Sequence, residues 1–135
     1  MQDILVAAIA LIRDRRVLMV TARGRDVIYM PGGKIDPGET AAEAAAREAF
    51  EEVSLQLDPA ELVELFTVVT QAHGEPAGRL VRMTVFHTRT EQDPAPAAEV
   101  SELHWASTAD LDRCPPAGRE VVERLAALGL IDQAA

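Results

Sequence analysis

The sequence from Gly33 to Leu55, GKIDPGETAAEAAAREAFEEVSL, joins a glycine-rich turn to a helix-forming segment that ends in three glutamates. Glu48, Glu51 and Glu52 are spaced i, i+3 and i+4, so their carboxylates lie within reach of each other on the predicted helix. Like charges at this spacing repel, and the helix dipole disfavours acidic groups near a helix C-terminus. A segment that breaks two local rules of helix formation is where we expect function.

Turn signals on the N-terminal side of this helix predict a loop. PGG at 31–33 and PG at 37–38 interrupt regular structure, so residues 31–39 are expected to leave several backbone amides free to face a ligand. Thr40 followed by Glu43 is the pattern of a capping box, which predicts a helix from about Ala41 to Val53. The apolar positions expected to pack on a sheet, on an arc separate from the three glutamates, are Ala42, Ala45, Ala46, Ala49, Phe50 and Val53.

Elsewhere the sequence alternates between apolar segments typical of strands and polar turns. The segment HGEPAG at 73–78 separates two apolar segments and predicts a hairpin with an exposed loop. A short strand with Trp105 pointing inward and a C-terminal amphipathic helix complete the pattern. The strands are predicted at 4–12, 17–21, 27–30, 62–70, 80–88 and 100–106, and the last helix at 117–128.

The chain has 135 residues and fits one domain spanning 1–135. Its content of 48% hydrophobic and 26% charged residues is that of a soluble globular protein, which favours a cytoplasmic location. The longest apolar run, Ile4–Ile12, has no basic segment before it and no cleavage site after it, so it is interpreted as a buried strand. The lone cysteine, Cys114, excludes an intrachain disulfide and is given no chemistry.

The net charge of −9 argues against duplex nucleic acid and against a membrane surface as partners. An acidic protein binds a phosphorylated small molecule when divalent cations lie between its carboxylates and the phosphate oxygens. Carboxylates suit Mg²⁺ or Mn²⁺, whereas zinc prefers the His and Cys ligands that this segment lacks. The alternative, an ordinary solvated acidic face, does not explain why the glutamates occur together with a glycine-rich loop and Glu39.

Gly33, Glu39 and the run from Arg47 to Leu55 resemble the signature of the Nudix hydrolases of the MutT type, which spans 23 residues. Ser54 is the one departure, because the family has a glycine there that ends the helix. That position often takes the left-handed conformation, which costs a non-glycine residue about 1 kcal/mol. The resemblance continues outside the motif in PGGK before it and EVSELHW in the last third, and so covers most of the chain.

The resemblance implies an α/β fold of the Nudix type, an α/β/α sandwich with a mixed β-sheet between the motif helix and a C-terminal helix. It also implies hydrolysis of a nucleoside diphosphate linked to another moiety, assisted by Mg²⁺ or Mn²⁺. The expected cation ligands are the motif carboxylates and one backbone carbonyl, namely Glu48, Glu51, Glu52 and Gly33. Arg47 is expected to orient these glutamates through a salt bridge, although its spacing alone fits an ordinary exposed helix pair equally well.

A general base is still required for hydrolysis, and Glu48 or a carboxylate from outside the motif could supply it. Glu99 is the outside candidate, with Glu102 behind it; the alternative for both is a surface acid. His87 and His104 fall in predicted strands, where a lone histidine is more often packed or exposed than catalytic.

Basic residues near the motif are candidate phosphate contacts. Lys34 is the only lysine of the chain and lies in the motif loop, while Arg23 and Arg25 precede the third predicted strand. The alternative for the two arginines is that they are solvated loop charges. Glu39 is grouped with these three as a residue of the substrate site.

The sequence leaves the substrate open. Residues 56–80 carry none of the additional signatures associated with cleavage of NADH, diadenosine polyphosphates or ADP-ribose. The first hypothesis is that the protein is a pyrophosphohydrolase of nucleoside triphosphates, including oxidised ones. The second hypothesis is that it hydrolyses ADP-ribose or nucleotide sugars. A reading of another class is a Nudix-fold binding or regulatory module without turnover. A homodimer fits the family resemblance, but no exposed apolar seam in the sequence requires one.

Overall fold

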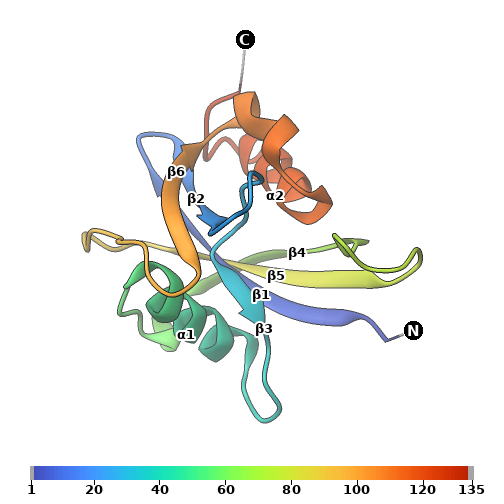
Figure 1. Ribbon diagram of the computed structural model, residues 1–135. Coiled ribbons are helices and arrows are strands. Elements are labelled where there is room, and N and C mark those ends of the chain that lie inside the picture. The colour runs from blue at the N-terminus through green and yellow to red at the C-terminus, as the bar shows by residue number, and fades with distance from the viewer. Residues whose placement is uncertain (1, 134–135) are drawn as a thin grey trace.

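The computed structural model describes residues 2–133, and its strands form a mixed sheet flanked by two α-helices within that range (Figure 1). The strand order is β4-β5-β1-β2-β6, and β3 pairs with β1 outside this path. The strands are β1 (Ile4–Arg13), β2 (Arg16–Ala22), β3 (Gly32–Lys34), β4 (Val63–Gln71), β5 (Leu80–Thr88) and β6 (Val100–Ala106). The helices are α1 (Ala41–Val53) and α2 (Pro116–Ala127), with short 3₁₀ turns at η1 (Pro59–Glu61) and η2 (Thr108–Arg113).

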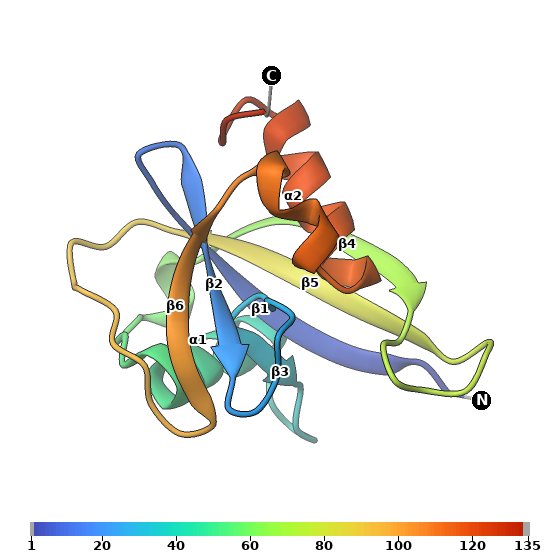
Figure 2. The same cartoon turned by 45° about the horizontal axis from the view of Figure 1, so that its top comes forward.

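The central strand β1 is buried on both faces and divides the core in two. It runs parallel to β5 and antiparallel to β2 and β3. Ile9 and Leu11 point into the cluster that contains the buried face of α1, whereas Ala8 and Ala10 point into the cluster that contains α2. The two helices therefore cover opposite faces of the sheet, as Figures 1 and 2 show, and the predicted α/β/α sandwich is confirmed.

Helix α1 begins at the predicted capping box. The Glu43 N–H donates to the Thr40 hydroxyl, and the Thr40 N–H donates to the Glu43 carboxylate. The buried arc of α1 differs from the prediction, because Phe50 is 55% exposed and Ala44 is buried instead. At 100° per residue this shift turns the buried face towards Glu48 and Glu52. Glu48 and Glu52 are therefore partly buried at the edge of the packed side of the helix, whereas Glu51 stays exposed.

Two local predictions around β3 were wrong. Residues 27–30 were expected to form a strand, but only Tyr29 bridges to β2, opposite Val20. Residues 31–39 were expected to form a loop throughout, but Gly32–Lys34 pair with β1. A Cβ at Gly32 would lie 2.3 Å from the Ala7 carbonyl oxygen, so glycine is required here for close approach of the two strands.

The segment 90–99, which we call the strap, leads from β5 to β6 past the C-terminal end of α1. The Ala95 and Ala97 N–H groups donate to the carbonyls of Val53 and Glu52, which would otherwise lack partners at the helix end. Ser54 has φ 61° and ψ 27°, the left-handed conformation expected at this position. Its hydroxyl donates to the Ala95 carbonyl at 3.2 Å, so the residue that replaces the family glycine also fastens the strap.

The remaining elements follow the prediction closely. Strands β4 and β5 form the expected antiparallel hairpin, and α2 differs from the expected helix by one residue at each end. Trp105 packs at the margin of the α1-side core beneath the Arg13 guanidinium, 5.8 Å from its ring centre. Within residues 2–133, none of the helices combines the length and apolarity that crossing a membrane requires.

We predict that Gly32→Ala destabilises the protein by about 3 kcal/mol or more, because the added methyl group meets backbone atoms of β1. The matched control is Gly38→Ala, where φ is +82° but nothing lies within 4 Å of the new Cβ. That variant should lose only about 1 kcal/mol from backbone strain. Urea unfolding gives both free energies, and equal losses would contradict the close approach.

Candidate active site

The guanidinium of Arg47 is the hub of the acidic cluster. Its Nε and Nη2 donate to the two oxygens of Glu39 at 2.8 and 3.0 Å. Its Nη1 donates to Glu48 Oε1 at 3.0 Å and reaches both oxygens of Glu51 at 3.4 Å. Nη2 also donates to the Lys34 carbonyl at 3.1 Å, which ties the helix to the end of β3. Arg47 thus holds the motif loop and the helical glutamates in one arrangement.

Glu39 anchors this hub and is not free to bind another group. Both of its oxygens accept from Arg47, and Oε1 also accepts from the Asp36 N–H at 3.0 Å. These bonds lower the pKa of Glu39 from 4.5 to about 2, chiefly through the hydrogen bond from Arg47. The same pair raises the pKa of Arg47 above its already high value. Glu39 lies outside the residues that line the cleft, so the geometry assigns it to holding Arg47.

Glu52 is the buried member of the cluster. Burial raises its pKa from 4.5 to about 8, and a hydrogen bond with Glu48 and the charges of Glu48 and Glu51 add to that rise. The Gly32 N–H donates to its Oε1 at 3.2 Å, which opposes the rise only in part. Burial and the neighbouring carboxylates therefore make the charged form of Glu52 costly when no cation is bound.

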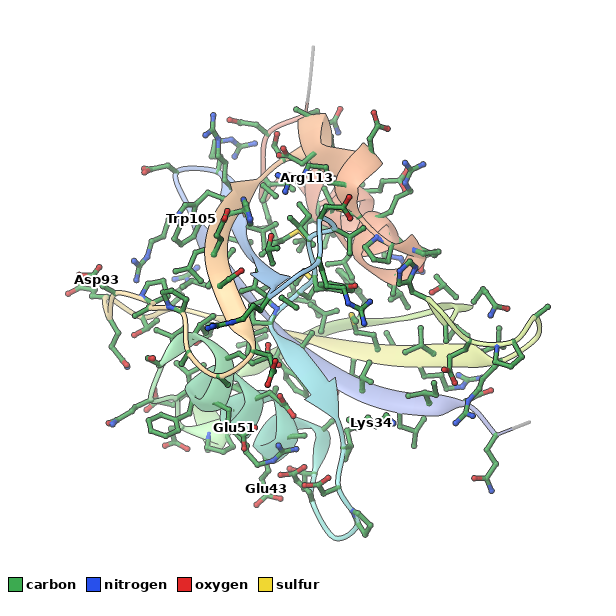
Figure 3. All side chains as sticks on the ribbon, in the orientation of Figure 1. Lys34, Glu43, Glu51, Asp93, Trp105 and Arg113 are labelled. Atoms are coloured by element: carbon green, nitrogen blue, oxygen red, sulfur yellow. The ribbon has the colours of Figure 1, made fainter. Side chains whose placement is uncertain are left out.

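Gly33 allows the carboxylate of Glu48 to lie directly against the β3 backbone. A Cβ at Gly33 would be 2.5 Å from Glu48 Oε1 and 2.9 Å from Oε2. The Glu48 side chain is only 15% exposed in this position. Figure 3 shows the neighbouring carboxylate Glu51, on α1, on the side of the helix that faces β3 and Lys34. Because Gly33 has no side chain, its backbone and the largely buried carboxylate of Glu48 can lie in close contact.

The donor set of this cluster consists of oxygen atoms, which fits a hard divalent cation and not zinc. In the orientation that Arg47 imposes, no group of three or more His, Cys, Asp or Glu side chains among residues 2–133 is arranged to hold a metal ion. Glu48 and Glu51 both accept hydrogen bonds from Arg47, which engages Glu48 through Oε1 only.

A cleft of about 570 Å³ opens beside the cluster. Lys34 and Glu99 line it together with the three motif glutamates, so these sequence predictions fall at one site. Arg23 and Arg25 do not line the cleft. The Arg23 N–H donates to the Glu99 carbonyl at 2.7 Å, and the Arg25 guanidinium donates to the Tyr29 hydroxyl at 3.4 Å. Both arginines therefore lie at its margin.

The far part of the cleft is formed by residues that the motif did not reveal. Tyr29 lines it, whereas the aromatic residues Phe66, Phe86 and Trp105 do not. His73 also lines it, although the sequence gave no reason to single it out. Its position at the cleft depends on where the β4–β5 hairpin places the loop, and no local signal in the sequence encodes that placement. The other lining residues of the hairpin loop are Gln71, Ala72 and Glu75.

The NUDIX domain profile matches residues 3–125, so this chain belongs to the NUDIX domain family. A curated relative, Nudix hydrolase 3 of Caenorhabditis elegans, is 38% identical over 52 residues. That match covers 38% of this chain but only 21% of the relative, so the chain spans about a fifth of that protein's length.

Solved structures share the fold over nearly the whole chain. The E. coli ORF135 protein is 24% identical with a TM-score of 0.76, covering 96% of this chain and 92% of its own. A MutT NUDIX hydrolase from Burkholderia pseudomallei is 23% identical with a TM-score of 0.73, covering 93% and 99%. The E. coli dihydroneopterin triphosphate pyrophosphohydrolase is 20% identical with a TM-score of 0.70, covering 92% and 95%. At these identities the likeness establishes the fold.

The ion pair between Glu39 and Arg47 makes the free energy of unfolding depend on pH in the acid range. The pKa of Glu39 is about 2 in the folded chain against 4.5 ordinarily. The pair therefore contributes its full stability above about pH 4.5 and loses it as the pH falls towards 2. We predict that the melting temperature of the wild type falls more steeply in this window than that of Glu39→Gln. Glu64→Gln, an exposed carboxylate on β4, is the control and should keep the steep slope; equal slopes for all three proteins would contradict the assignment.

Proposed function

We propose that this protein catalyses the Mg²⁺-dependent hydrolysis of a diphosphate bond in a nucleoside diphosphate derivative. The observation that carries the proposal is the oxygen-only cluster of Glu48, Glu51 and Glu52, which lines one cleft and has Glu48 directly against the Gly33 backbone. Three carboxylates that repel one another in the absence of a cation are best explained by a function that brings one. Mn²⁺ has the same ligand preference and is expected to substitute.

Each residue of the site has a separate role in the proposed reaction. Glu48, Glu51, Glu52 and the Gly33 carbonyl would hold the cation, which supplies charge neutralisation at the phosphate oxygens and activation of the attacking water. Arg47 keeps the glutamates in position from behind. Lys34, at the end of β3, would contact a phosphate oxygen, with Arg23 and Arg25 as further contacts at the margin.

Two groups are candidates for the general base that takes a proton from water. Glu48, which lines the cleft beside the proposed cation site, is the candidate from within the motif. Glu99 is exposed at the edge of the cleft, and the strap joins it to α1 through the hydrogen bond from Ala97 to Glu52. Loss of turnover in Glu99→Gln without loss of cation binding would assign the base to Glu99.

The substrate that we favour is a nucleoside triphosphate, including oxidised forms, which would give the monophosphate and pyrophosphate. The cleft of about 570 Å³ lies within the size range of small-molecule binding sites. The E. coli structural neighbour described as a dihydroneopterin triphosphate pyrophosphohydrolase supports the same reaction type. ADP-ribose or a nucleotide sugar is the second candidate, since another neighbour, from Francisella tularensis, is described as a bifunctional enzyme with ADP ribose pyrophosphatase activity.

The experiment is product release from a substrate panel with Mg²⁺ present or absent. The panel contains the ribo- and deoxyribonucleoside triphosphates, 8-oxo-dGTP, ADP-ribose and a nucleotide sugar. We expect pyrophosphate from at least one triphosphate and a loss of at least about 100-fold in kcat for Glu52→Gln. Glu64→Gln, remote from the cleft, should keep wild-type rates.

The products separate the alternatives. AMP and ribose 5-phosphate without pyrophosphate would establish the second candidate substrate and overturn the first. Binding of nucleotides without any Mg²⁺-dependent product would show a non-catalytic Nudix module and overturn the proposed hydrolysis.

A further inference from the structure

The loop that joins β4 to β5, residues 72–79, forms the wall of the cleft farthest along the sheet from α1. In Figures 1 and 2 this hairpin extends from the sheet on the side away from α1. His73 and Glu75 of the loop line the same cleft as the three motif glutamates. One continuous cavity therefore has an acidic end at α1 and a second end at the hairpin. The acidic end accounts for the diphosphate but not for the rest of the substrate.

The side chain of Gln71, the last residue of β4, gives this loop a fixed shape. Its Nε2 donates to the carbonyls of Ala72, Glu75 and Pro76 at 3.2, 3.2 and 2.9 Å. Its Oε1 accepts from the Gly78 N–H at 2.9 Å. All four bonds of the amide group end on the backbone of the hairpin loop, so both N–H groups of Gln71 are used within the loop. Its effect is to hold the loop, and His73 with it.

His73 faces Tyr29 across the mouth of the cleft. The two ring centres are 6.5 Å apart, and the planes meet at 67° in an edge-to-face arrangement. Tyr29 comes from the segment between β2 and β3, whereas His73 comes from the hairpin, so the two walls meet through an aromatic pair. The nitrogens of the exposed His73 ring have no hydrogen-bond partner within residues 2–133. They are available to a ligand in the cleft.

The floor between these walls is apolar. Ile4 and Val6 of β1 lie beside Val81 and Met83 of β5, with registers Ile4 to Val81 and Val6 to Met83. All four side chains are only partly buried, because nothing in residues 2–133 covers them completely. This lining suits a planar aromatic heterocycle, whose faces would lie on aliphatic carbon and the Tyr29 ring and whose polar edge would reach the His73 nitrogens. A sugar has no apolar face of that size.

We propose that His73 is a specificity-determining residue that contacts the heterocycle of the substrate, and that Gln71 is the positioning residue that holds His73 in place. The inference rests on the proposed function for the identity of the substrate as a nucleotide. It adds that the base binds at the hairpin end of the cleft, and that His73 contacts the base while Gln71 positions His73.

The test uses binding of reaction products, so it needs no turnover. Nucleoside monophosphates (AMP, GMP, CMP and UMP) and ribose 5-phosphate are titrated with Mg²⁺ into the full chain labelled at histidine. Ribose 5-phosphate carries the same phosphate and sugar but no base. We expect at least one monophosphate to shift the His73 ring resonances, and ribose 5-phosphate to leave them in place. Equal shifts with both ligands, or no shift with any monophosphate that binds, would overturn the proposal.

Variants distinguish a direct contact of His73 with the base from a general effect on the structure. His73→Ala should weaken binding of the best monophosphate about tenfold, as removal of one aromatic base contact does, without weakening ribose 5-phosphate. His87→Ala is the matched control, because His87 lies on β5 outside the main cleft and should bind like the wild type. Unchanged monophosphate affinity in His73→Ala would overturn the proposal. His73 is exposed, so this variant is expected to fold normally.

The role of Gln71 is tested by a double-mutant cycle. If Gln71 acts through His73, Gln71→Ala weakens the monophosphate several-fold, but adding it to His73→Ala produces no further loss. Losses that multiply in the double variant would show that Gln71 acts by another route and overturn its positioning role. In turnover assays both single variants should raise KM and leave kcat within about twofold. If hydrolysis is absent while the binding results hold, the proposed function fails and this inference stands.

Discussion

Three carboxylates near the C-terminal end of one helix must be kept together against their mutual repulsion, and the structure is arranged around that constraint. Arg47 neutralises part of the charge by reaching Glu39, Glu48 and Glu51 at once. Burial raises the pKa of Glu52 to about 8, which favours its neutral form more than that of an exposed glutamate. Neither effect neutralises the negative charge of the cluster completely. A divalent cation would supply that charge where the cleft opens.

The scaffold brings backbone and carboxylates closer than ordinary side chains allow. Gly32 lets β3 pair tightly with β1, and Gly33 lets the Glu48 carboxylate lie against the strand. Helix α1 presents alanines to the sheet, so its axis lies close enough for Glu52 to accept from the Gly32 N–H. The strap then satisfies the Glu52 and Val53 carbonyls at the helix end. The glycines and the alanines let α1 and β3 lie close together, and the strap satisfies the carbonyls at the end of α1.

The sequence predicted those parts of the molecule whose causes are local. The capping box at Thr40, the left-handed Ser54 and the β4–β5 hairpin each depend on a few neighbouring residues, and the structure contains all three. The pairing of β3 was missed because glycines rarely favour a strand, and only the approach of β1 explains them. Burial of Glu52 and exposure of Phe50 depend on how α1 rotates against the sheet. His73 could not be identified beforehand, since the hairpin places it at the cleft through contacts distant in sequence.

The central claim is that the glutamate cluster destabilises the fold until a cation binds. The most direct measurement is the melting temperature of the wild type and of Glu52→Gln at a pH above 8, with and without Mg²⁺. Without Mg²⁺ the wild type should melt below the variant, because Glu52 is then a buried charge among like charges. At a Mg²⁺ concentration 100-fold above its Kd, the wild type should gain about 2.7 kcal/mol, or about 10 °C for a chain of this size, and the variant much less. A wild type that melts above Glu52→Gln without Mg²⁺ and gains no more from the cation would contradict the account.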